Sequence, residues 1–180
     1  AVNFQLEAQA IATSHDQVPF WFRARQGGSV PLSGLSGSLV GHIYKDYDTT
    51  RRRTIDWGIG LEGRANGNKS ETDLILVQAN AKLKLAMFEI RAGRWRGQTG
   101  LTDTLLTSGA FSISGNALGI PQVQISVPEF FPVPFTNGWV AFKGSFCHGW
   151  LGKVALTDSY WVDSVKTYFH HKSLNGRLGK

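Results

Sequence analysis

A cluster of cations around one tryptophan is the part of this sequence best suited to bind a ligand. The cluster lies within six residues and consists of Arg91, Arg94, Trp95 and Arg96. Guanidinium groups interleaved with an indole are typical of sites that stack single-stranded nucleic acid, and of sugar sites in which an aromatic face packs on a pyranose ring. A purely structural stack of these side chains is the alternative. The segment is therefore a candidate binding site beside the more common structural interpretation, and its ligand is not identified.

Five cations, Arg91 of this cluster among them, fall on the polar side of segments in which apolar and polar residues alternate. They are Arg64, Lys82, Lys84, Arg91 and Lys143. A net charge of +6 and a sequence pI near 9.7 favour an anionic partner such as nucleic acid, lipopolysaccharide or acidic polysaccharide. If the segments are neighbouring strands, these cations form a basic stripe on the polar face of one sheet. The candidate ligand-binding residues are therefore Arg64, Lys82, Arg91, Arg94, Trp95, Arg96 and Lys143.

The sequence lacks the common motifs of catalysis and metal binding. Its five histidines show no His-Glu-x-x-His spacing, and its single cysteine excludes a Cys-x-x-Cys motif. Residues 63–70 come close to a phosphate-binding loop, but Asn68 replaces the second glycine, so this segment is interpreted as a hairpin turn. A serine acting with His148 or His170 is the alternative that spacing alone leaves open. We expect no catalytic residue, no cofactor and no metal site.

Alternation of apolar and polar residues predicts about seven strands, because successive side chains of a strand point to opposite faces. The fourth carries the apolar residues Ile75, Val77, Ala79, Ala81 and Leu83. Irregular structure is expected over residues 14–34, and a long connection over residues 97–138. The expected strands cover about 2–13, 35–44, 54–65, 75–84, 88–93 and 140–150, with the last near 174–178.

Strands with one apolar and one polar face occur in two classes of protein. A soluble sheet buries its apolar face in a core, whereas a transmembrane β-barrel turns that face to lipid and the polar face to water, with strands of roughly 10 residues. Two of the predicted connections are long, and barrels combine short periplasmic turns with longer extracellular loops. The basic stripe slightly favours the barrel, because a lumen wall can carry it in contact with water.

Several short segments together carry a resemblance to a known family. The most specific is His170-His171-Lys172-Ser173-Leu174-Asn175-Gly176-Arg177; others are Ala92-Gly93-Arg94-Trp95-Arg96, Ser114-Gly115-Asn116-Ala117, Pro121-Gln122-Val123-Gln124-Ile125-Ser126 and Phe142-Lys143-Gly144-Ser145-Phe146. With these segments the chain resembles the capsule assembly protein Wzi family in the form found in Bacteroidetes. Members of that family are outer-membrane β-barrels longer than this chain, and the match is to their N-terminal portion. The resemblance implies a role in anchoring or organising surface polysaccharide, with lectin-like binding and no covalent chemistry.

These observations predict an all-β protein, an antiparallel meander that forms part of a transmembrane outer-membrane β-barrel with long loops. Residues 1–180 are expected to be a single domain, an incomplete barrel of about seven strands. The expected partners are acidic surface polysaccharide or lipopolysaccharide, outer-membrane lipid and other envelope proteins, but not nucleic acid. The alternatives are a passive porin-like channel, a subunit of a larger envelope complex, or a soluble β-sheet protein that binds an anionic polymer.

Overall fold

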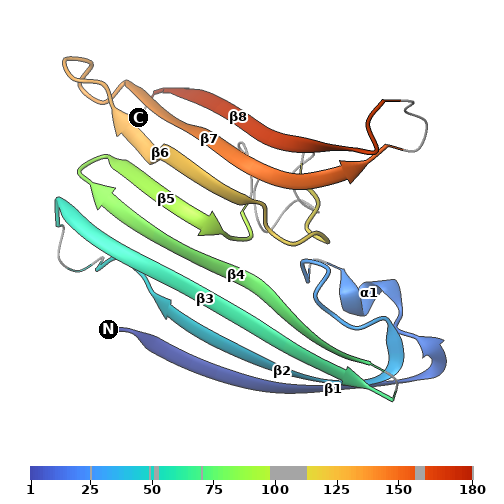
Figure 1. Ribbon diagram of the computed structural model, residues 1–180. Helices are drawn as coiled ribbons and strands as arrows, with labels where there is room; N and C mark the ends of the chain where they lie inside the picture. The colour runs from blue at the N-terminus through green and yellow to red at the C-terminus, as the bar shows by residue number, and fades with distance from the viewer. Residues whose placement is uncertain are drawn as a thin grey trace. The chain divides into compact units, whose positions relative to one another are not determined.

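The computed structural model describes residues 1–24, 26–48, 50, 53–69, 71–97, 113–156 and 161–179. Within them the strands hydrogen-bond in chain order as one antiparallel meander sheet of eight strands, which is not closed into a barrel (Figure 1). The elements are β1 (Asn3–Gln17), α1 (Phe20–Arg23), β2 (Ser33–Lys45), β3 (Ile55–Asn68), β4 (Thr72–Leu85), β5 (Phe88–Arg94), β6 (Pro121–Pro132), β7 (Val140–Ala155) and β8 (Ser164–Leu178). In this part of the chain, no helix is long and apolar enough to cross a membrane.

The predicted all-β meander is confirmed, but the predicted count of about seven strands is wrong. The missed strand is β6, which lies inside the predicted connection 97–138. Proline is depleted in strands because it cannot donate to the ladder, except at strand ends and bulges. Pro121 and Pro132 are the two ends of β6, and Pro128 lies where its pairing with β7 shifts register. Residues 98–112 of the predicted connection lie outside the described residues.

The chain divides into two compact units. The first consists of Ala1–Tyr47, Trp57–Ala81 and Arg94–Gly119, and contains β1, β2 and most of β3 and β4. The second consists of Asp48–Asp56, Lys82–Gly93 and Ile120–Lys180, and contains β6, β7, β8 and most of β5.

The first unit has a continuous apolar face on β1, β2 and β3, as the alternation predicts. Cross-strand neighbours on this face share apolar character: Phe4 lies opposite Ile43, which lies opposite Leu61. Phe4 is 80% exposed. The apolar face is defined by Phe4, Leu6, Ala8, Ala10 and Ala12 on β1, by Leu35, Gly37, Leu39, Gly41 and Ile43 on β2, and by Leu61, Gly63, Ala65 and Gly67 on β3.

The opposite, polar face is buried on β2 and β3. The relative solvent exposure of Glu62, Arg64 and Asn66 is only 5%, 3% and 6%. Backbone segments from outside the strands contact or adjoin this face: Asn66 Nδ2 donates to the carbonyl of Ser29 at 2.9 Å, and Gly27 N donates to the carbonyl of Gly115 at 3.0 Å. The burial is therefore the reverse of that in a soluble sheet, whose core face is apolar.

Exposure along β4 does not follow one parity as predicted. Val77, expected on the same face as Ala81 and Leu83, is completely buried, whereas Leu74 and Leu76 before it are exposed. The exposed residues thus change from even to odd positions along the strand. Val77 therefore does not share the exposure of Ala81 and Leu83, which alternation predicts to lie on the same face.

In the second unit, β7 pairs with β6 on one side and with β8 on the other. Leu174 and Leu178 on β8 are 80% and 85% exposed, while Ala141 and Cys147 on β7 are buried. The pairing is interrupted twice, between Val127 and Phe131 of β6 and between Trp150 and Gly152 of β7.

Candidate functional site

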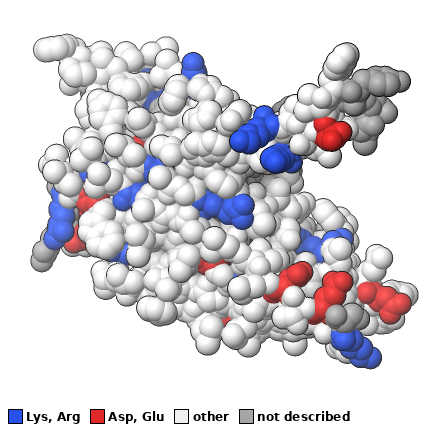
Figure 2. Space-filling view, in the orientation of Figure 1, with Lys and Arg blue, Asp and Glu red and all other residues white. Residues whose placement is uncertain are grey.

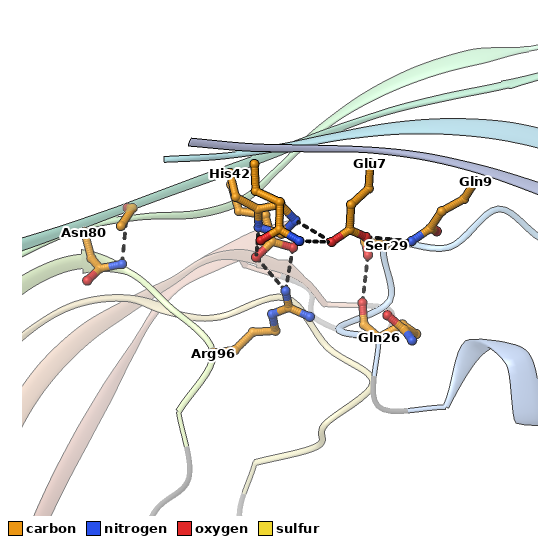
Figure 3. A network of polar contacts seen from close by, with 10 residues as sticks. Glu7, Gln9, Gln26, Ser29, His42, Asn80 and Arg96 are labelled. Carbon is orange, nitrogen blue, oxygen red and sulfur yellow. Dashed lines mark hydrogen bonds and ion pairs between the residues drawn. The ribbon is translucent and has the colours of Figure 1, made fainter. Parts of the chain in front are cut away.

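A network of polar and charged side chains lies on the polar face of the first unit (Figure 3). His42 Nδ1 lies 3.6 Å from Glu62 Oε2, and His42 Nε2 lies 3.9 Å from Glu7 Oε1. Arg96 Nη2 donates to both carboxylate oxygens of Glu62, at 2.5 and 2.6 Å. The sheet register creates this arrangement, because His42 lies directly opposite Glu62 on the neighbouring strand. We call Glu7, His42, Glu62 and Arg96 the carboxylate network.

Arg64 adjoins this network and is held by three neutral acceptors. Its Nη2 donates to Gln9 Oε1 at 2.7 Å and to Ser38 Oγ at 3.1 Å. Its Nε donates to Asn66 Oδ1 at 2.9 Å, and the same oxygen accepts from Ser38 Oγ at 2.7 Å. A buried cation is tolerated only when its donors are satisfied. The guanidinium of Arg64 is thus committed to holding β1, β2 and β3 together on their polar face.

The structure brings together some of the sequence-predicted site residues in the first unit. Arg64 and Arg96 both lie on its polar side, near Glu62. Trp95 is only 4% exposed, so little of its indole is accessible for stacking. Arg94 Nη1 donates to the carbonyl of Leu76 at 3.3 Å.

The remaining candidates belong to the second unit. Lys82 on β4 and Arg91 on β5 are half-buried, and each interacts with other groups. The ammonium of Lys143 lies 5.2 Å from the ring centroid of Phe130, and the guanidinium carbon of Arg177 lies at the same distance from it. The Phe130 ring therefore contacts two cations.

Glu7 and Glu62, the acidic partners of His42 and Arg96, are not among the predicted site residues, because that prediction considered only cations and one tryptophan. Glu62 and Arg64 are two residues apart in one strand, so they share a face. The same spacing relates Arg64 to Asn66. A carboxylate, a cation and an amide at alternate positions of one strand form a polar row, and this signal was available in the sequence.

The described residues give limited scope for other chemistry. Within them, no group of three or more His, Cys, Asp and Glu side chains could hold a metal ion. A hollow of about 330 Å³ in the first unit is lined in part by Asp16, Glu71 and Asp73, and none of the described residues that line it is Lys or Arg. The three carboxylates repel an acidic polymer, so a basic binding surface is not located there.

No known protein family, curated protein or solved structure matches this chain. The arrangement of side chains within each unit is thus what bears on function.

Proposed function

We propose that this chain forms part of the wall of an outer-membrane β-barrel that attaches or organises surface polysaccharide without catalysis. The observation that carries the proposal is the reversed burial of the first unit. Phe4 and Leu6 are 80% and 72% exposed, whereas Arg64 is 3% exposed. Apolar surface in water costs about 25 cal/mol per Å², so such a face is stable when hydrocarbon covers it. Charged side chains also occupy only small, separate areas of the surface seen in Figure 2.

The length of the apolar face agrees with a bilayer. The apolar positions continue from Val2, which directly precedes β1, to Ala12 on β1. At the usual rise of a strand this stretch is about 34 Å long. A tilt of about 40° reduces it to roughly 26 Å along the membrane normal, close to the apolar band of known transmembrane barrels.

The polar face suits the inside of a barrel. Charged groups within the bilayer face the protein interior or a water-filled space, paired with one another. Glu62 is paired with Arg96, and Arg64 is satisfied by neutral side chains. The segments that contribute Ser29 and Arg96 lie on this side, where they would fill part of a lumen.

The glycan role is supported by charge and by the resemblance to the Wzi family. The net charge of +6 favours an acidic polysaccharide or lipopolysaccharide. We infer that Lys82, Arg91 and Lys143, half-buried cations on β4, β5 and β7, contribute to glycan binding through their charge. Other envelope proteins would complete the barrel or assemble with it.

The membrane proposal is tested by placing the same charge on opposite faces of one strand. Ala8 lies on the apolar face and Gln5 on the polar face of β1, and both are exposed. In a bilayer, Ala8→Arg is expected to destabilise the inserted protein by about 2–4 kcal/mol, while Gln5→Arg has little effect. The measurement is folding into lipid vesicles, followed by β-sheet circular dichroism. If the two variants fold into vesicles equally well, and the protein stays dispersed in water without detergent, the proposal is overturned.

The glycan proposal is tested separately with alginate as the acidic polysaccharide. The double variant Lys82→Gln, Arg91→Gln should weaken binding, and added salt should weaken the remaining binding. Arg53→Gln with Lys69→Gln removes the same charge at exposed positions and serves as the control. If both pairs weaken binding equally, net charge alone attracts the polymer and no site exists on β4 and β5.

A further inference from the structure

A β-bulge in β7 places two lysines directly opposite each other. Trp150 pairs with Tyr168, but the next registered pair is Gly152 with Thr167, so β7 contains one extra residue. Gly152 has φ +90°, a left-handed conformation that glycine adopts without strain. After this bulge Lys153 pairs with Lys166. Without the extra residue, Lys153 would be one register position away and on the other face of the hairpin.

The two lysines are exposed, and no ion pair to either is found in the part of the chain that the structure describes. Like charges directly opposite on neighbouring strands are destabilising. The bulge therefore concentrates positive charge at a position where this charge does not stabilise the hairpin. An anion bound between Lys153 and Lys166 would relieve the repulsion.

The lysine pair lies at one end of the exposed face of β7 and β8, and the side chains of this face become more polar towards it. Leu174 and Leu178 are apolar and strongly exposed. Towards the β7–β8 connection, Tyr168 stacks on His148 with ring centroids 5.7 Å apart, and Trp150 meets His148 edge-on at 5.2 Å. Aromatic rings with polar groups mark the boundary between hydrocarbon and headgroups in membrane barrels.

His170 and Lys172 lie on β8 between Tyr168 and Leu174, and both contact an aromatic ring. The ring centroids of His170 and Phe146 are 4.9 Å apart. The ammonium of Lys172 lies 5.5 Å from the centroid of Phe146, a cation–π geometry that accommodates the charge beside apolar surface. The order along the face is thus apolar, then aromatic with polar groups, then the lysine pair.

We propose that Lys153 and Lys166 bind the phosphate of an anionic lipid headgroup at the membrane surface, with Trp150 and Tyr168 at the boundary beneath it. This inference rests on the proposed membrane function of the chain. Ammonium groups bind phosphate as compact point charges. Each lysine near an anionic membrane surface strengthens association about fivefold.

The test uses the full chain in detergent micelles, with phosphatidylglycerol and phosphatidylcholine as probes and native mass spectrometry to measure lipid dissociation constants. The wild type is expected to prefer phosphatidylglycerol. Lys153→Gln with Lys166→Gln should weaken phosphatidylglycerol binding by roughly 25-fold and leave phosphatidylcholine binding unchanged. Arg53→Gln with Lys69→Gln is the charge-matched control and should change either constant less than about twofold.

Lys153→Glu separates lipid binding from folding. A glutamate opposite Lys166 replaces repulsion by attraction, so the variant should resist urea unfolding better than the wild type. It should nevertheless lose its preference for phosphatidylglycerol. Unchanged preference in this variant, or equal loss in the charge-matched control, would overturn the lipid site.

The two proposals fail in different ways. A protein that inserts into vesicles but binds the two lipids equally contradicts the lysine site alone. A protein that never inserts contradicts the membrane function, and the lipid site falls with it.

Discussion

Arg96 Nη2 donates to both carboxylate oxygens of Glu62, and Glu62 is buried whereas Arg96 is about one-third exposed. The pair joins a residue outside the sheet to the polar face of β3. Glu62→Gln leaves the Arg96 guanidinium without its carboxylate and is expected to cost about 2–3 kcal/mol, less than a fully buried pair because Arg96 is partly in water. Urea unfolding in detergent measures the loss.

Glu7→Gln is the comparison for this prediction. Glu7 has a 41% exposed side chain and lies 3.9 Å from His42, so its removal should cost less than about 1 kcal/mol. If both substitutions destabilise the protein equally, the contact between Arg96 and Glu62 is not what holds the covering segment in place.

Arg64→Lys tests whether the geometry of the guanidinium, rather than its charge, is required. An ammonium cannot reproduce both the Nε contact to Asn66 and the Nη2 contacts to Gln9 and Ser38. We expect a loss of about 1–3 kcal/mol, because at least one buried acceptor loses its donor. Unfolding of the Lys variant at the wild-type urea midpoint would show that charge alone suffices.

A pair of glycines in the first unit predicts opposite responses to the same added methyl group. A Cβ on Gly119 would lie 2.2 Å from the carbonyl oxygen of Trp95, whereas a Cβ on Gly41 meets nothing within 4 Å. Gly119→Ala should therefore cost about 1–3 kcal/mol through overpacking against backbone. Gly41→Ala should be close to neutral.

These two variants are compared by thermal unfolding in detergent. Because Gly41 lies on the apolar face, its alanine variant should also insert into vesicles as well as the wild type. A destabilised Gly41→Ala would mean that another chain packs against that face.

Alternation of residue types was sufficient to predict the faces of β1, β2 and β3. Their pairing is uninterrupted from Asn3 to Ala12 of β1 and from Ser36 to Lys45 of β2, so even and odd positions keep their faces throughout. The complete burial of Val77 was not predicted, because the parity of the exposed residues changes within β4. β6 was missed because its prolines are typical of loops, and only the pairing partner shows that they occupy the ends and the irregular part of a strand.

The candidate site was only partly predictable for a different reason. Sequence spacing places Glu62 and Arg64 on one face, but it does not show that Arg96, 34 residues after Glu62, contacts the same carboxylate. That contact depends on how the segment after β5 packs against β3. Tertiary pairing of this kind has no local signal, so the cations were expected to be available to a ligand.

Phe130 controls how far Lys143 is available to a ligand in the second unit. Its ring contacts the ammonium of Lys143 and the guanidinium of Arg177, each about 5.2 Å from the centroid. Phe130→Leu keeps an apolar side chain but removes the negative ring face, so it should destabilise the protein by about 1 kcal/mol. In a Lys143→Met background the same substitution should cost less, because one of the two cations is already absent.

The single and double variants are compared by urea unfolding in detergent, and equal costs in both backgrounds would show that the ring and the lysine are not coupled. The same variants also address glycan binding. Phe130→Leu releases Lys143 from the ring, so alginate should bind at least as well as to the wild type, whereas Lys143→Met should weaken binding. If neither change alters alginate binding, Lys143 is confined to a structural role on the polar side of β7.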